Sequence, residues 1–138
     1  MVGNSGEMVS VSGIYKRYKD LPVLLNLSFD IPKGSIFGYI GPNGSGKTTT
    51  IKIMTGLIRD FQGEVSIEGR SIRNWSSELS STIGYLPQQT SLQEWRTVDQ
   101  TLYTFGRLSG LQASEVDKRI KEVTEMLGIA EYRKRKVS

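Results

Sequence analysis

The most constraining feature of this sequence is a glycine-rich run at residues 41–48, which reads Gly41-Pro42-Asn43-Gly44-Ser45-Gly46-Lys47-Thr48. The run fits the pattern G-x-x-x-x-G-K-[ST], in which backbone N–H groups surround a phosphate. Glycines allow the backbone to curl where a Cβ would obstruct the anion. A helix that begins near Gly46 would add its positive N-terminal end. The sequence therefore predicts a nucleoside triphosphate site.

Three side chains at the end of this run have expected roles. Lys47 would reach the β- and γ-phosphates, and the Thr48 hydroxyl would ligate Mg²⁺. Thr49, the next residue, is expected to contribute to the same nucleotide site. The alternative is a glycine-rich turn that meets the pattern by chance. The sequence around the run favours a true site, because an apolar, strand-like segment precedes it and a helix-like segment follows it.

Composition excludes several other kinds of chemistry. The 138 residues contain no cysteine and no histidine, so disulfides, thiolate metal sites and histidine-based proton transfer are excluded. A reducing cytoplasm is the expected location. Much of the net charge of +4 comes from the basic run at 133–136. We interpret that run as a solvated helix end or linker, since no aromatic residue is interleaved to stack bases, and we expect no nucleic-acid partner.

Hydrophobic periodicity predicts strands on both sides of the phosphate loop. Residues 8–14 and 23–31 alternate like half-exposed strands, and a short strand between two turns is expected within 61–69. Two short apolar runs, at 36–40 and 83–86, are expected to be strands as well, the first of them buried and leading into the phosphate loop.

Three helices are expected from the same kind of pattern. The first runs from about 46 to 57 and has an expected inner face of Ile51, Met54, Leu57 and Ile58. The second covers 97–108, with Val98, Leu102, Phe105 and Leu108 at helical spacing. The third covers 114–127, with Ser114 as the expected N-cap and Gly128 as the residue that ends it.

This order of elements, together with two further segments, resembles the ATP-binding subunit of ABC transporters. Residues 14–18 read Ile-Tyr-Lys-Arg-Tyr and resemble the segment whose aromatic ring stacks on adenine; the resemblance favours Tyr18, with Tyr15 as the alternative. Residues 83–88 resemble the segment that ends in the Q-loop glutamine, here Gln88 or its neighbour Gln89. A glutamine there can join the Mg²⁺ or water shell around the γ-phosphate. The implied cofactors are ATP and Mg²⁺.

The resemblance also implies partners. The helical pair at 97–127 resembles the helical subdomain that docks on a membrane permease, and Trp95 is a candidate anchor residue. Seen alone, two amphipathic helices more often pack within their own core. A second ATPase subunit, expected as a homodimer, would close over the γ-phosphate. The expected location is therefore cytoplasmic, at the inner face of the membrane through the permease.

The resemblance covers residues 8–138 and then stops. It implies an α/β phosphate-loop NTPase of ABC type, with an antiparallel β subdomain, phosphate loop and Q-loop at 8–90 and a helical subdomain at 91–138. Residues 1–7 are expected to form a flexible leader. The family's signature motif, Walker B aspartate, catalytic glutamate and switch histidine have no counterpart in this sequence. We therefore expect the N-terminal part of a longer ATPase, an incomplete core sheet, and nucleotide binding with little or no turnover.

Other functions are compatible with a phosphate loop. A GTPase should carry an Asn/Thr-Lys-x-Asp guanine-reading motif, and a small-molecule kinase should show catalytic acids around an acceptor pocket; neither is found. An ABC-type ATPase without a transport role remains an alternative. So does an ATP-binding module without turnover, in which the nucleotide only stabilises the fold or a partner surface.

Overall fold

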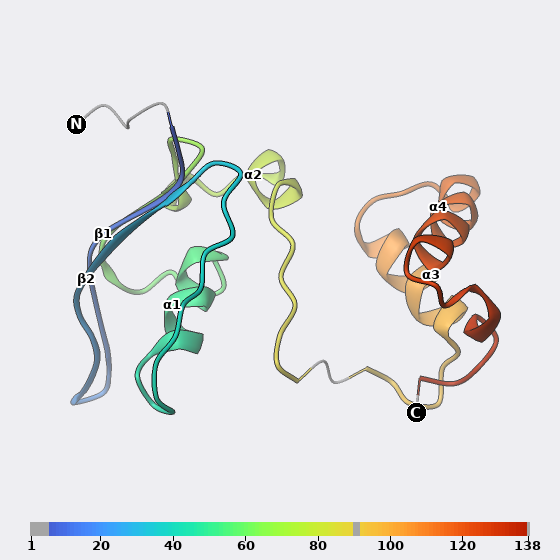
Figure 1. Ribbon diagram of the computed structural model, residues 1–138, viewed down its shortest axis with the longest axis horizontal. Coiled ribbons are helices and arrows are strands. Elements are labelled where there is room, and N and C mark those ends of the chain that lie inside the picture. The colour runs from blue at the N-terminus through green and yellow to red at the C-terminus, as the bar shows by residue number, and fades with distance from the viewer. Residues whose placement is uncertain (1–5, 90–91, 138) are drawn as a thin grey trace. The chain divides into compact units, whose positions relative to one another are not determined.

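The structure is a computed structural model that describes residues 6–89 and 92–137. The chain divides into two compact units, Met1–Tyr85 and Leu86–Ser138, and each is described by itself (Figure 1). Residues 1–5 of the predicted leader lie outside the described residues. The same holds for residues 90 and 91, where the boundary between the two subdomains was expected.

The first unit is built on an antiparallel sheet with the strand order β2-β1-β3-β4. Strands β1 (Glu7–Tyr18) and β2 (Leu21–Pro32) form a long hairpin whose last pair is Tyr18 with Leu21. Strand β3 (Gln62–Ile67) pairs with the other side of β1, and the short β4 (Arg70–Ser71) follows it. The alternating patterns at 8–14, 23–31 and within 61–69 therefore predicted these strands correctly.

One helix covers this sheet. Helix α1 (Lys47–Met54) buries Ile53 completely against the hairpin and β3. A 3₁₀ turn (Ile72–Asn74) and the short helix α2 (Ser77–Ser81) extend the same core. The buried apolar side chains of this core are Val11, Ile14, Leu24, Ile53, Phe61, Val65, Ile67, Ile72 and Leu79.

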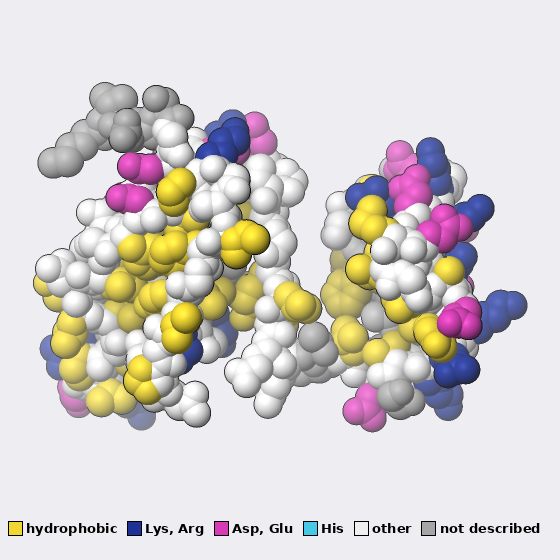
Figure 2. Space-filling model, in the orientation of Figure 1, with side chains coloured by type: hydrophobic (Ala, Val, Ile, Leu, Met, Phe, Trp, Pro, Cys, Tyr) yellow, Lys and Arg dark blue, Asp and Glu magenta, His cyan; other side chains and the backbone are white. Residues whose placement is uncertain are grey.

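The two strands expected at 36–40 and 83–86 do not form, and these predictions were wrong. Ile36 and Ile40 are 103% and 92% exposed, and Leu86 is 85% exposed. A strand needs a neighbouring strand to take up its N–H and C=O groups. The described sheet consists of β2, β1, β3 and β4, and neither segment pairs with any of them. Figure 2 shows apolar side chains gathered on the drawn face of this unit.

The predicted inner face of α1 is correct in part, since Met54 and Ile58 pack against the core. Ile51 and Leu57 are 39% and 60% exposed, whereas Thr50 and Ile53 are buried. The helix ends at Met54, three residues earlier than expected, because Gly56 adopts a positive φ of 71° and breaks the helical path. Ile53, which the predicted face did not include, is completely buried. Periodicity over eight residues does not determine every buried position of so short a helix.

The second unit is a helical pair formed by α3 (Val98–Leu108) and α4 (Ala113–Met126), followed by a 3₁₀ turn (Ala130–Tyr132). The two helices approach closely at Gly106, where a Cβ would stand 3.1 Å from the Val116 methyl groups. Gly128 ends α4 as predicted, with φ at 67°. The predicted N-cap Ser114 was wrong: Gln112 is the N-cap, because its backbone N–H bonds Glu115 in a capping box.

Two residues of the predicted apolar face of α3 are not buried. Phe105 is 53% exposed and Leu108 is 77% exposed, while Thr101 is buried. None of the helices in the described residues is long and apolar enough to cross a membrane.

The basic run at 133–136 is built into this second unit. The N–H groups of Val98 and Asp99, at the start of α3, donate to the carbonyls of Arg135 and Arg133 at 3.0 Å each. Arg133 Nε also donates to Asp99 Oδ1 at 2.7 Å, and this hydrogen bond raises the pKa of the Arg133 guanidinium above its ordinary value. The run therefore satisfies the unpaired N–H groups of a helix start rather than serving only as a linker.

Candidate functional site

The glycine-rich run is a loop that leads directly into α1. Gly46 is the N-cap of this helix and adopts a left-handed conformation with φ at 86°. Gly44 does the same, with φ at 82°. These two positive φ angles turn the backbone toward the helix start, and L-residues with a Cβ rarely adopt them. The spacing of the glycines in the sequence matches these two turns.

The loop is also closed on itself and packed on the hairpin. Ser45 N–H donates to the Pro42 carbonyl at 3.3 Å, and a Cβ on Gly41 would stand 2.8 Å from Ser45 Oγ. A Cβ on Gly46 would stand 3.0 Å from the Val23 carbonyl oxygen. Asn43 and Gly44 are exposed. The loop therefore keeps a compact curve whose outer side faces solvent.

Lys47 bends back over the start of the loop. Its Nζ donates to the carbonyl oxygens of Gly41 at 2.6 Å and Pro42 at 2.7 Å. Among the described residues no carboxylate pairs with this ammonium group, and the first turn of α1 carries no acidic side chain. The lysine charge and the helix N-terminus therefore add up to an uncompensated positive site. These residues fit a polyphosphate anion.

The three threonines that follow Lys47 have different surroundings. Thr48 is exposed, Thr49 is half-buried and Thr50 is buried. Thr50 Oγ1 donates to the Gly46 carbonyl at 3.1 Å and lies 3.3 Å from the Tyr39 hydroxyl, so it fixes the first turn of the helix to the loop. Sequence reasoning missed Thr50, because burial alone separates it from its neighbours. Thr48 is an exposed residue next to Lys47 and carries a hydroxyl, which suits a Mg²⁺ ligand.

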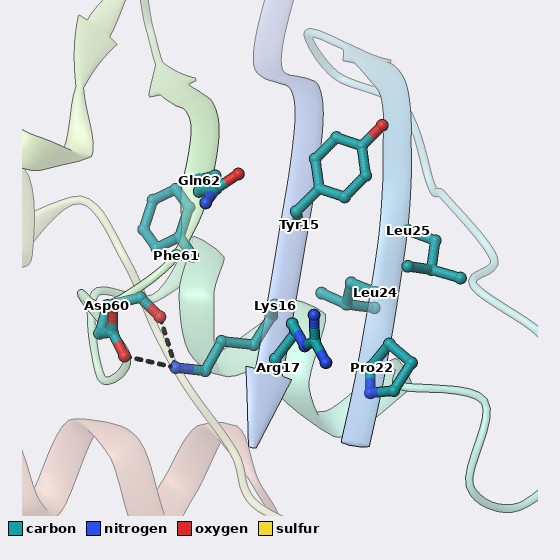
Figure 3. A pocket seen from close by; sticks show the side chains of 9 residues that line it. All are labelled: Tyr15, Lys16, Arg17, Pro22, Leu24, Leu25, Asp60, Phe61 and Gln62. Atoms are coloured by element: carbon teal, nitrogen blue, oxygen red, sulfur yellow. Dashed lines mark hydrogen bonds and ion pairs between the residues drawn. The ribbon is translucent and has the colours of Figure 1, made fainter. Parts of the chain in front are cut away.

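The two candidate adenine-stacking tyrosines lie at different places on β1. Tyr18 ends the strand, is 47% exposed, and pairs with Leu21 at the tip of the hairpin. This tip is near the loop, since Val23 follows Leu21 by two residues and contacts the Gly46 position. Tyr15 is 42% exposed and lines a cavity of about 560 Å³ on the hairpin (Figure 3). The role of Tyr18 as the adenine-stacking residue stays a prediction.

The cavity contains an ion pair that sequence reasoning missed. Lys16 is only 7% exposed, yet its Nζ donates to the Asp60 carbonyl at 2.5 Å and to Asp60 Oδ2 at 2.9 Å (Figure 3). The residues that line the cavity are Tyr15, Lys16, Arg17, Pro22, Leu24, Leu25, Asp60, Phe61 and Gln62. No sequence signal marks the pair, because its members are 44 residues apart.

The other candidate residues belong to the second unit. Gln88 and Gln89 are both exposed, and the expected role of Gln88 at the γ-phosphate stays a prediction. Trp95 is 65% exposed, and the Arg96 guanidinium lies 5.0 Å from the centre of its ring. Arg96 also lines a cavity of about 240 Å³. The residues that line this cavity are Leu92, Gln93, Arg96, Thr101, Thr104, Phe105 and Leu108.

Known proteins resemble the chain over most of its length. A linearmycin resistance ATP-binding protein, LnrL, of Bacillus subtilis is 34% identical over 130 residues, and the Nod factor export ATP-binding protein I of Ralstonia nicotianae is 36% identical over 121 residues. These alignments cover 94% and 88% of this chain but only 42% and 38% of the two relatives. The chain thus spans less than half the length of these proteins.

Solved structures show the same fold. The ATP-binding subunit of an ABC transporter aligns with a TM-score of 0.74 at 25% identity, over 94% of this chain and 54% of that one. The cbiO1 protein of Clostridium perfringens, part of the transporter complex cbiONQ, aligns with a TM-score of 0.79 at 21% identity, over 95% and 54%. The predicted α/β fold of ABC type is confirmed. The family model described as ABC transporter matches residues 24–138, and the chain belongs to this ATP-binding family.

Proposed function

We propose that this chain binds Mg²⁺-ATP through residues 41–49, as part of an ATPase that couples ATP hydrolysis to transport across a membrane. The observation that carries the proposal is the uncompensated positive charge at the start of α1. There the left-handed Gly44 and Gly46 curve the loop, and the Lys47 ammonium donates to the carbonyls of Gly41 and Pro42. Family membership supports the same conclusion.

Each residue of the loop has a distinct task in this proposal. The N–H groups of the curved backbone would donate to phosphate oxygens, as the glycine-rich geometry allows. Lys47 would exchange its contacts with the Gly41 and Pro42 carbonyls for the β- and γ-phosphates. Thr48, and Gln88 through the Q-loop, would hold Mg²⁺, which when bound neutralises charge on the phosphate oxygens. Tyr18 would stack on the adenine ring.

The proposed partners are a membrane permease and a second copy of the ATPase. The names of the relatives support a transport role, since one is called an export ATP-binding protein. The exposed Trp95 and the exposed side of α3 at Phe105 are the proposed permease-facing surface. We propose that the protein acts at the inner face of the membrane through this permease.

The amount of turnover is a separate part of the proposal. Hydrolysis requires a group that orients the attacking water as well as a phosphate cradle. The described site offers Lys47 and Thr48, which bind and position, and we propose that the chain of 138 residues binds ATP with little turnover. Phosphate release measured beside binding tests this part independently.

Calorimetric titration of Mg²⁺-ATP into the purified chain tests the proposal. Saturable binding is expected, and Lys47→Ala should abolish it because the cation that the loop itself supplies to the phosphates is lost. Lys52→Ala is the matched control, since it removes a lysine from the last turn of the same helix. Equal binding by wild type and Lys47→Ala, or absence of binding by a folded wild-type chain, would contradict the proposal.

A further inference from the structure

The Lys16–Asp60 ion pair is unusually asymmetric. The Lys16 side chain is 7% exposed, whereas the Asp60 side chain is 101% exposed. Burial of an ammonium group is unfavourable unless its hydrogen bonds are satisfied, and here the Asp60 carbonyl and carboxylate satisfy two of three donors. Figure 3 shows the lysine extended from β1 toward the segment that precedes β3. The Lys16 ammonium group is therefore held between β1 and the segment that precedes β3.

The same ammonium group lies against an aromatic ring. Lys16 Nζ is 5.1 Å from the centre of the Tyr18 ring, within the range of a cation–π contact. Tyr18 ends β1 and its ring is half exposed. A half-exposed tyrosine at a hairpin tip would otherwise sample several rotamers, and ordering it on ligand binding would lower affinity. The lysine restricts this freedom before any ligand arrives.

We propose that Lys16 is a positioning residue for nucleotide-base recognition, acting through Tyr18. Asp60 holds the ammonium in place, the ammonium holds one face of the Tyr18 ring, and the other face is left for the base. This inference rests on the proposed function, in which Tyr18 stacks on adenine. A merely structural lysine would instead tie β1 to the segment before β3, and its loss would affect every ligand of the phosphate loop equally.

Binding of two ligands by the full chain separates these roles. Dissociation constants are measured for Mg²⁺-ATP and for Mg²⁺-tripolyphosphate, which has the phosphates but no base. Lys16→Met keeps the length of the side chain and removes its charge. The expected result is about three- to tenfold weaker ATP binding, the range that follows from ordering one side chain, with tripolyphosphate binding unchanged. Lys16→Arg, which keeps the cation, should restore most of the ATP affinity.

Two further variants complete the test. In a Tyr18→Ala background, Lys16→Met should have no additional effect on ATP binding, because a residue that acts through Tyr18 has nothing left to position. Lys33→Met is the matched charge control: it removes an exposed cation just beyond the other end of the same hairpin and should leave both affinities unchanged.

The outcomes distinguish this inference from the proposed function. The positioning role would be overturned if Lys16→Met weakened the binding of both ligands equally. It would also be overturned if Lys16→Met weakened ATP binding as much in the Tyr18→Ala background as in the wild type. Neither result would contradict ATP binding by the chain. Wild-type binding of ATP and tripolyphosphate with the same affinity would show that no base is stacked, which overturns the role of Tyr18 as well. A wild-type chain that binds neither ligand would overturn both proposals.

Discussion

Gly46 lies so close to Leu24 that a Cβ on the glycine would stand 2.6 Å from the Leu24 Cδ2 atom. Leu24 is a buried residue of β2 and belongs to the core of the first unit. The last glycine of the phosphate loop is therefore held against the antiparallel sheet, and the sheet sets the position from which α1 begins. Loop geometry and core packing are coupled at this one contact.

Gly46→Ala is expected to lower both stability and ATP affinity. A Cβ at a φ of 86° costs about 1–2 kcal/mol, and the contact with Leu24 adds roughly 1–3 kcal/mol of overpacking. Urea denaturation gives the free energy of unfolding. Gly44→Ala is the control, since it has a similar φ but open space around its Cβ position. Equal destabilisation by the two variants would show that the Leu24 contact contributes nothing.

Replacement of isoleucines in α1 tests which face of the helix is buried. Ile53→Ala should destabilise the first unit by about 2–5 kcal/mol, because Ile53 is 0% exposed in the core. Ile51→Ala should cost less than about 1 kcal/mol, since that side chain is 39% exposed. Thermal unfolding of both variants measures the difference. If Ile51→Ala were more destabilising than Ile53→Ala, Ile51 would lie on the buried face of the helix, as the sequence predicts.

Thr101→Val is expected to stabilise the second unit, whereas most substitutions of buried residues lower the free energy of unfolding. Thr101 Oγ1 is buried and has no hydrogen-bond partner among the described residues. Valine has the same shape and removes a polar group whose burial costs about 1–3 kcal/mol. Hydrogen exchange of the α3 amides should slow accordingly.

Thr124→Val is the matched control for this prediction. Thr124 is also buried in the helical pair, but its Oγ1 donates to the Ile120 carbonyl at 2.8 Å. Loss of that bond should leave stability unchanged or lower it by about 1 kcal/mol. Faster hydrogen exchange in Thr101→Val would contradict the predicted stabilisation. It would mean that water in the adjoining cavity hydrogen-bonds the Thr101 hydroxyl.

The elements that the sequence predicted well are those whose pattern is local. The alternation of apolar and polar residues over 8–14 and 23–31 predicts β1 and β2, because one face of each strand packs on the core and the other faces solvent. The phosphate-loop glycines were predicted because their positive φ angles impose a residue type. The α/β class follows from such local signals together with the resemblance.

The elements that the sequence did not predict depend on distant partners. The apolar run at 36–40 has strand composition, yet a strand forms only beside another strand, and the described residues provide none there. In the sequence nothing distinguishes Lys16 from other basic residues, because its partner Asp60 is 44 positions away and lies beside it only in the folded chain. Thr50 differs from Thr48 by burial alone.

Removal of Mg²⁺ should expose the separate role of Thr48. ATP affinity is measured with Mg²⁺ and again with excess EDTA, and the ratio of the two gives the contribution of the metal. Thr48→Val should shrink this ratio by about tenfold, the loss of one interaction of roughly 1.4 kcal/mol, while metal-free affinity stays the same. Because Thr48 is exposed, the substitution should change stability by less than about 0.5 kcal/mol. Thr48→Ser keeps the hydroxyl and should therefore keep the ratio of the two affinities. If Thr48→Ser lowered this ratio as much as Thr48→Val does, the effect would come from packing at the helix start rather than from metal ligation.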